Sequence, residues 1–445
     1  MMSDLSINTC NNDEVIYRPI EKTPPAFYVV LSILIGILIF AGALYISQLR
    51  HGLGITGMNR PVYWGFYIIN FVFFIGVSHA GTLISAILRL CEAEWRRPIT
   101  RMAEIITVVV LCIGGLHPVL DLGRPDRMLN LFKYGRLQSP LLWDVISVTA
   151  YFTASSIYLY LPLIPDIAIL RDRGTSPHWL YEFLAWGWQG TEIQKKVLHR
   201  AMNILMIMVI PIAISVHTII AYIFAMTLRA GWHSTIFGPY FVVGAIFSGI
   251  ASIFIVLIVF RKIYHFENYL KPIHFQNLSK LLLVMSLVWF YFTFSEMLTD
   301  FFGKEPHHFN VLMSKLTGPY AEWFWVMFVC NFLLPVIILS FPKLRTISGI
   351  FVASCGVVVG MWIERYLIVV PSLSHSIFEE GIYHPALVEM TLFVGAVSAF
   401  MLGYMLFSKF FPLISIWEIE EGRKDAVLIV SNKIRNYQPV YEKNT

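Results

Sequence analysis

An imidazole and a carboxylate share one helical face in the run GGLHPVLDLGRP. His117 and Asp121 are four residues apart, which places their side chains on the same side of a helix, although Pro118 loosens the backbone between them. Gly123 then supplies a C-terminal stop. Arg124 either holds the Asp121 carboxylate in its ionised form or is an ordinary cation at a membrane interface.

A second imidazole lies in an apolar run that is rich in small residues. His79 is in the middle of VSHAGTLISAILRL, between Gly76 and Gly81, and small residues allow a neighbouring helix or a flat ring to approach closely. An ionisable group in a spanning helix indicates function, although a histidine that only bridges two helices is the alternative. Asp144, in SPLLWD, is either a site residue or a carboxylate stabilised by a helix N-terminus.

These groups predict a binding site for a lipid-soluble carrier of two electrons and two protons. Each quinol hydroxyl needs a hydrogen-bond acceptor that takes its proton as the electron leaves, and a base with a pKa near ambient pH does this best. We therefore expect His79 and Asp121 to be catalytic. The expected quinone-binding set is His79, His117, Asp121, Arg124 and Asp144.

Other ionisable residues lie inside or at the ends of the remaining apolar runs. They form either a discontinuous proton route or a set of buried ion pairs and helix caps. The candidates for a proton route are Glu104, His217, Glu296, Asp300, Glu364, Arg365 and Glu389.

The sequence contains few residues in patterns that could bind a permanently attached cofactor. Its five cysteines are scattered, without CxxC or CxxCH, so we expect no iron–sulfur cluster and no c-type haem in this chain. His79 with His217 is the one plausible ligand pair for a b-type haem, and we do not favour it. We predict no metal site, and the absence of Walker, HExxH and GxSxG patterns argues against a hydrolase.

Long apolar helices must position these residues. The chain has 445 residues, of which 57% are hydrophobic and 14% charged, whereas soluble domains have about 45–50% and about 25%. Roughly 20 apolar residues cross a hydrocarbon core as a helix. We predict an all-α integral membrane protein whose spanning helices cover 25–47, 62–90, 99–121, 142–164, 198–226, 237–262, 275–302, 319–341, 346–370 and 386–411.

The helices are expected to form two four-helix bundles, at about 62–226 and 237–370, with two flanking helices. The membrane domain, 25–411, lies between an N-terminal segment, 1–24, and a tail, 412–445. A secondary transporter would also use two bundles, but it is disfavoured because Gly- or Pro-broken helices do not recur at matching places in the two halves.

Basic residues predict the orientation. Lysine and arginine are about twice as frequent in the connections on the side of the N-terminus, so we expect both termini to be cytoplasmic, and no cleaved signal peptide. The 165–197 connection, rich in tryptophan, should hold a short interfacial helix. The loop 122–141 is rich in basic residues although we expect it on the outer side, where such residues are fewer. This suggests a docking role for Arg124, Arg127, Lys133 and Arg136. No basic run suggests nucleic acid as a partner.

Several runs of the chain resemble one family of membrane proteins. SHAGTLISAILRL, RRPITRMAE, LDLGRPDRM and SPLLWD are similar to the NrfD/polysulfide reductase membrane-subunit family. LPLIPDIAILRDR, RAGWHSTIFGPYFVVGAIFSG and GMWIERYLIVVPSL look most like the ten-helix ActC subunit of alternative complex III. The resemblance covers about residues 60–375, and LDLGRP departs from the His-x-Gly-Arg-Pro of many relatives.

The resemblance implies a membrane subunit that oxidises menaquinol or ubiquinol near the periplasmic face of a bacterial or archaeal cytoplasmic membrane. Its implied partners are a periplasmic iron–sulfur subunit, multihaem c-type cytochromes and a second NrfD-like subunit, besides lipid. The family's quinone-site histidine corresponds to His79, and the position before GRP corresponds to Asp121, with Arg124 following. Proton translocation is a further expectation. A quinone-reducing anchor of a polysulfide- or sulfur-type reductase, or a purely structural anchor, is the alternative.

Overall fold

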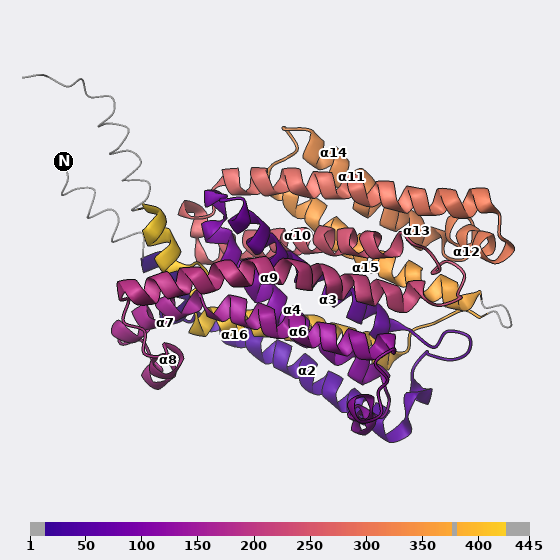
Figure 1. Cartoon of the computed structure of the whole chain (residues 1–445), viewed down its shortest axis with the longest axis horizontal. Coiled ribbons are helices and arrows are strands. Elements are labelled where there is room, and N and C mark those ends of the chain that lie inside the picture. Colours follow the sequence, from indigo (N-terminus) through magenta and orange to yellow (C-terminus); the bar gives the residue numbers. More distant parts are fainter. Residues whose placement is uncertain (1–13, 376–380, 424–445) are drawn as a thin grey trace, which may run out of the picture.

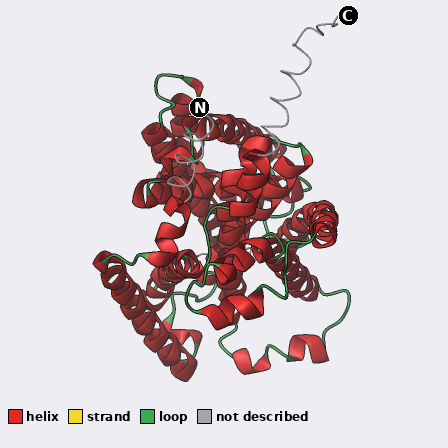
Figure 2. Cartoon of the chain, turned by 90° about the vertical axis from the view of Figure 1, so that its left-hand side faces the viewer, coloured by secondary structure: helices red, strands yellow, loops and turns green. Residues whose placement is uncertain are grey.

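The computed structural model describes residues 14–375 and 381–423, which form helices and loops without a strand (Figure 2). Within these described residues, nine helices are long and apolar enough to cross a membrane, and two further helices that bend by 42° at their junction are long and apolar enough when taken together. The crossings are α2 (Pro25–His51), α3 (Phe66–Leu90), α4 (Arg97–Asp121), α6 (Pro140–Tyr160) with α7 (Leu163–Asp172), α9 (Glu192–Ala225), α10 (Phe237–Tyr264), α11 (Pro272–Gly303), α13 (Ala321–Phe328) with α14 (Leu334–Ser340), α15 (Ile347–Ser374) and α16 (Leu387–Phe410).

The predicted all-α membrane fold is confirmed, and most predicted ends lie within a few residues of the observed ones. α9 begins at Glu192, six residues before the expected position, because Thr191 and Gln194 form a capping box that starts the helix in polar sequence. α3 begins at Phe66, after Gly65, and not at position 62. Hydropathy detects only the apolar part of a helix, so polar caps shift its ends.

Short helices fill the connections. They are η1 (Leu53–Ile55), η2 (Glu94–Arg96), η3 (Pro125–Arg127), α5 (Asn130–Lys133), α8 (His178–Leu184), η4 (Phe266–Asn268), α12 (Pro306–Leu316) and the π-helical turn η5 (Val329–Leu333) between α13 and α14. Residues 14–21 and 416–423 are also helical. α8 lies in the predicted interfacial connection, where Trp179 and Trp186 are exposed.

The long helices run side by side, with α3 and α10 in the interior (Figure 1). α3 packs against α4, α9, α10, α15 and α16, whereas α2 packs mainly against α16 at the edge. A Cβ at Gly81 would overlap the Ala103 carbonyl oxygen, so this glycine lets α4 approach α3 closely, as predicted.

Successive crossings alternate in direction, so the two ends of the bundle can be named. We call the end that holds His51, Asp121 and Asp144 the outer end, after the predicted orientation, and the opposite end the inner end. The segments 14–21 and 416–423 both lie at the inner end (Figure 1).

Candidate functional site

The run GGLHPVLDLGRP forms the outer end of α4. α4 ends at Asp121, and Gly123 follows with a φ of +61°, in the left-handed region that favours glycine. A Cβ at position 123 would lie 3.0 Å from Leu53 Cγ. The predicted stop at Gly123 is therefore observed, and the turn packs against the segment that joins α2 to α3.

Three side chains near this end have a buried atom without a hydrogen-bond partner: His117 Nε2, Asp121 Oδ1 and Asp144 Oδ1. The His117 Nδ1 atom lies 2.9 Å from the Ile113 carbonyl oxygen. When Nδ1 donates to that oxygen, Nε2 of the neutral ring is an acceptor. Buried polar groups normally have partners, so these acceptors suit a ligand that donates hydrogen bonds.

The packing of α4 against α6 brings Asp144 to the level of His117. At the inner end, Arg101 donates to the Pro162 carbonyl oxygen at 2.8 Å. The two helices run in opposite directions with the same rise per residue. His117 on α4 and Asp144 on α6 are nearly the same number of residues away from this contact. Asp144 therefore lies within about one turn of His117 along the bundle axis. Asp121 lies about one turn further out on α4.

Arg124 pairs with Asp126 and not with Asp121, so of the two alternatives for this residue the surface cation is observed. Its Nε and Nη2 atoms donate to Asp126 at 3.0 and 2.9 Å, on the exposed surface. This hydrogen-bonded guanidinium lowers the pKa of Asp126. The chain takes a left-handed turn at Gly123 between the two residues, and Asp121 Oδ1 has no hydrogen-bond partner.

His79 lies in the middle of the bundle, away from Asp121. Its Nδ1 atom lies 2.8 Å from the Ile75 carbonyl oxygen, and its Nε2 atom lies 2.6 Å from the Ala213 carbonyl oxygen on α9. Thr107 donates to the carbonyl oxygen of Ser78, next to His79, at 2.7 Å. Asp121 is therefore about 20 Å further along α4 than the level of His79.

The rings around His79 form a buried cluster. The centroid of His217 lies 4.2 Å from that of His79, and the centroid of Tyr151 lies 4.8 Å from it. His79 and His217 are both 0% exposed, and neither ring nitrogen of His217 has a partner. Direct contact between the imidazoles leaves no space for a porphyrin between them. Within the described chain, no three His, Cys, Asp or Glu side chains gather as a metal site would require.

A buried ion pair lies next to this cluster, on α15. The Glu364 Oε1 atom accepts from the Trp289 indole at 2.5 Å and from the Tyr240 hydroxyl. Arg365 Nη1 lies 3.4 Å from Glu364 Oε2, and the guanidinium stacks 4.7 Å from the Phe241 ring centroid. Because the Phe241 ring also neighbours His217, at 6.4 Å, the ion pair and the histidines belong to one interior region.

Two outer carboxylates of the second bundle, Glu296 and Asp300, line a further polar region. Ser234 donates to Glu296 at 2.8 Å, and His308 Nδ1 lies 3.4 Å from Asp300. A small cavity of about 50 Å³ connects these carboxylates with Lys315 and Tyr240. Glu296 and Asp300 therefore face Lys315, and Tyr240 links this region to Glu364.

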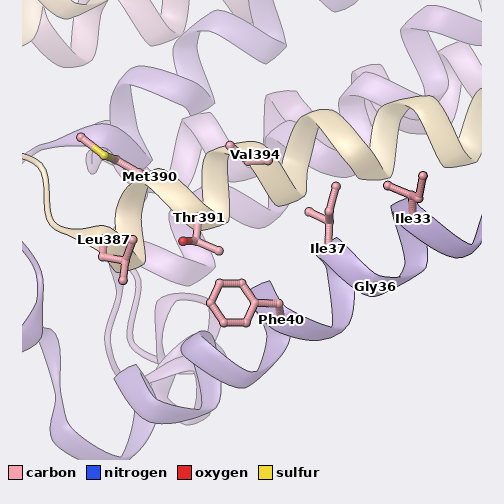
Figure 3. Close-up of a pocket in the computed structure, with 8 residues that line it drawn as sticks. All are labelled: Ile33, Gly36, Ile37, Phe40, Leu387, Met390, Thr391 and Val394. Carbon is pink, nitrogen blue, oxygen red and sulfur yellow. The ribbon is translucent and has the colours of Figure 1, made fainter. Parts of the chain in front are cut away.

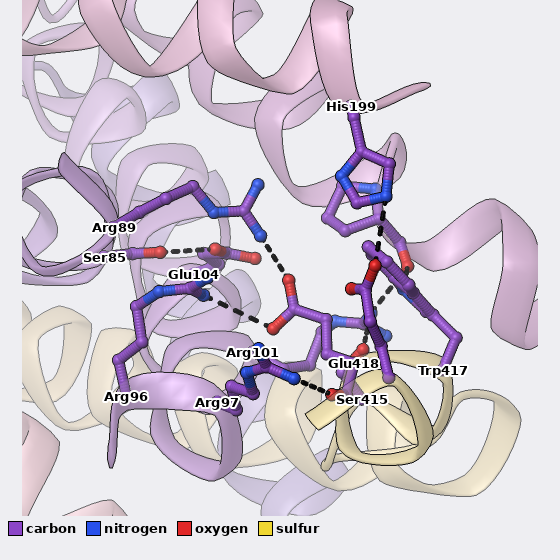
Figure 4. Close-up of polar contacts among 12 residues, drawn as sticks. Ser85, Arg89, Arg96, Arg97, Arg101, Glu104, His199, Ser415, Trp417 and Glu418 are labelled. Carbon is purple, nitrogen blue, oxygen red and sulfur yellow. Dashed lines mark hydrogen bonds and ion pairs between the residues drawn. The ribbon is translucent and has the colours of Figure 1, made fainter. Parts of the chain in front are cut away.

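At the inner end, Glu104 is buried beside a polar network that was not predicted from the sequence (Figure 4). Ser85 donates to Glu104 at 2.6 Å. Asp166, on α7, forms an ion pair of 3.0 Å with Arg101, and both side chains are almost fully buried. Asp166 also accepts from the amides of Ile416 and Trp417, at 3.1 and 3.0 Å.

The same network includes Glu418 from the C-terminal helix. Glu418 forms ion pairs with Arg89 and with Arg96, the second at 3.4 Å (Figure 4). The position of Asp166 inside the apolar run LPLIPDIAIL is the sequence feature that could have marked it as a buried polar residue. Nothing in the sequence indicated that residues 415–418 would fold back onto it.

An apolar groove of about 600 Å³ lies between α2 and α16 at the edge of the bundle (Figure 3). Its lining residues are Ile33, Gly36, Ile37, Phe40, Leu387, Met390, Thr391 and Val394. None of them is ionisable, so the groove can contact a hydrocarbon chain but offers no acid or base.

Apolar crossings with ionisable side chains buried between them define a multi-pass membrane protein. Residues 54–375 match the family model of NrfD, polysulphide reductase. The chain belongs to this family.

Three relatives extend the comparison, and each aligns over most of both chains. A Halobacterium salinarum protein, assigned provisionally as a membrane subunit of dimethyl sulfoxide reductase, is 25% identical over 86% of this chain and 91% of its own length. A selenate reductase subunit of Mesobacillus selenatarsenatis is 23% identical over 83% and 90%. The Hdr-like menaquinol oxidoreductase integral membrane subunit of Archaeoglobus fulgidus is 22% identical over 92% and 98%. This chain is thus similar to membrane subunits of oxidoreductase complexes.

Proposed function

We propose that the chain is the quinol-binding membrane subunit of a respiratory oxidoreductase, and that quinol binds at the outer end of α4. The observation that carries the proposal is the set of unpaired buried atoms on His117, Asp121 and Asp144. A quinol presents two hydroxyl donors on a flat apolar ring, which suits acceptors between apolar helices. The Archaeoglobus relative is named for menaquinol, which supports this ligand class.

We propose different roles in quinol oxidation for Asp121, His117 and Asp144. Quinol supplies two electrons and two protons when it is oxidised. Asp121 is proposed to accept one proton, because its unpaired Oδ1 is a carboxylate oxygen, and His117 Nε2 is proposed to accept the proton of the other hydroxyl, while the two electrons pass to the partner subunits. Asp144 lies level with His117 and is available as a second carboxylate. Menaquinol and ubiquinol both fit these groups.

The interior histidines are proposed to conduct protons. Polar side chains lie in succession, in three groups, from the inner end to the second bundle: Glu104 with Ser85, then Tyr151 with His79 and His217, then Arg365 with Glu364, Glu296 and Asp300. This succession supports a contribution to proton translocation. His79, which was expected to act together with Asp121, is assigned to this route and not to the quinol contacts.

The electrons are proposed to leave toward partners at the outer end. An iron–sulfur subunit with c-type cytochromes would receive them, and a second NrfD-like subunit would complete an assembly of the alternative complex III type. We propose the cytoplasmic membrane of a bacterium or archaeon, with both termini in the cytoplasm. A membrane anchor of a terminal reductase is the second candidate, and the names of the two reductase relatives favour it.

Photoaffinity labelling tests the position of the site. The purified complex would be illuminated with an azidoquinone, with and without excess unlabelled quinone, and digested for mass spectrometry. We expect competed labels within residues 113–145. Competed labels confined to α11–α14 would contradict the proposal.

A further inference from the structure

One carboxylate fastens the segment 52–65, between α2 and α3, to the start of α16. Glu389 is fully buried in the first turn of α16. Its Oε2 atom accepts from the amides of Gly57 and Ala386 at 2.7 and 2.8 Å, and its Oε1 atom accepts from the Tyr383 hydroxyl. The Tyr383 oxygen accepts in turn from the Phe66 amide, at 3.1 Å, where α3 begins.

Two glycines let the segments approach this closely. A Cβ at Gly57 would overlap the His384 carbonyl oxygen, and a Cβ at Gly65 would overlap the Tyr383 hydroxyl. Only glycine avoids these clashes with the present backbone. The contact between 52–65 and 381–389 is therefore a close-packed one, with Glu389 at its centre.

The fastened segment and the helices at its two ends contact the outer end of α4. Leu53 packs at Gly123, directly after the Asp121 turn. Gln48 donates to the Leu120 carbonyl oxygen at 2.9 Å and accepts from the Tyr67 hydroxyl at 2.6 Å.

Glu389 was a candidate proton carrier, but its contacts suggest another role. Both oxygens already accept hydrogen bonds, two of them from backbone amides that need an acceptor. A carboxylate engaged in this way holds backbone in place.

We propose that Glu389 and Tyr383 are positioning residues that hold segment 52–65 as a cover over the quinol site beside Asp121. The cover orients the quinol and limits access of water. This inference rests on the proposed function, because it needs the site to lie at the outer end of α4.

The test compares Glu389→Gln with Glu322→Gln in the assembled complex. Glutamine keeps the shape of the side chain, but its amide group can place N–H donors against backbone N–H donors. Glu322 is a matched control, since it is exposed in the first turn of α13. In Glu389→Gln we expect hydrogen exchange of amides 52–65 to rise about tenfold and the quinol KM to rise about fivefold, with kcat within about twofold. Glu322→Gln should change neither.

Tyr383→Phe is the second variant, because it removes one hydroxyl and preserves the fold more easily. It should raise the same exchange rates and the same KM by a smaller factor. Faster exchange in 52–65 with an unchanged KM in both variants would overturn the cover role, as would unchanged exchange. Failure of the proposed function itself would be recognised separately, by normal turnover of Asp121→Asn in the same preparation.

Discussion

The imidazoles of His79 and His217 contact each other at 4.2 Å between centroids, in the middle of the bundle and between α3 and α9. Both ring nitrogens of His79 face carbonyl oxygens, of Ile75 and Ala213. A neutral imidazole has one N–H, so only the protonated ring can donate to both oxygens. The two carbonyl oxygens fix the orientation of the ring, and the proposed proton route passes through its contact with His217.

Replacement of His217 should therefore affect proton movement more than quinol binding. His217→Phe keeps a ring and breaks no side-chain hydrogen bond, because neither ring nitrogen has a partner. We expect proton uptake per electron, measured in proteoliposomes, to fall, while the dissociation constant of a quinone analogue changes by less than about threefold. A tenfold loss of analogue binding with normal proton uptake would argue for a quinol contact at the histidines.

The inner network should control stability. Asp166→Asn leaves the buried Arg101 without its anionic partner, and breaking a buried ion pair costs about 3–5 kcal/mol. We expect a lower midpoint of thermal unfolding and earlier proteolysis at residues 415–423. Asp172→Asn is the control, because the Asp172 carboxylate of the Arg171–Asp172 pair is 67% exposed and should contribute under about 1 kcal/mol. Equal midpoints for the two variants would refute a stabilising role for the network.

The exposed basic loop at the outer end should bind a partner protein of the complex. Arg127 and Arg136 are both exposed there, and charge reversal of both should release an outer-side protein while the membrane chain stays folded. The measurement is which proteins remain in complexes purified through this chain. Reversal of the exposed inner-end residues Lys196 and Arg200 serves as the control, and retention of every partner in both variants would count against docking.

The sequence predicts the crossings well because membrane thickness fixes the length of each apolar run, and Gly123 ends α4 where expected. It does not predict which helices are neighbours. His117 and Asp121 share a face by spacing alone, whereas the contact of His79 with His217 depends on the packing of α3 against α9. Asp166 and Glu389 show the same limit, because Arg101 and Trp417, which bind Asp166, and Gly57, which binds Glu389, lie far away in the chain.

Turnover of Asp121→Asn tests the central claim most directly. Asparagine keeps the shape of the side chain but cannot take a proton, and loss of a general base costs about 10²–10⁴ in rate. The measurement is quinol-dependent reduction of the native acceptor by the purified, fully assembled complex. We predict a fall of at least about 10² in kcat, with assembly intact. Turnover within about twofold of the unmodified complex would contradict a quinol site at the outer end of α4.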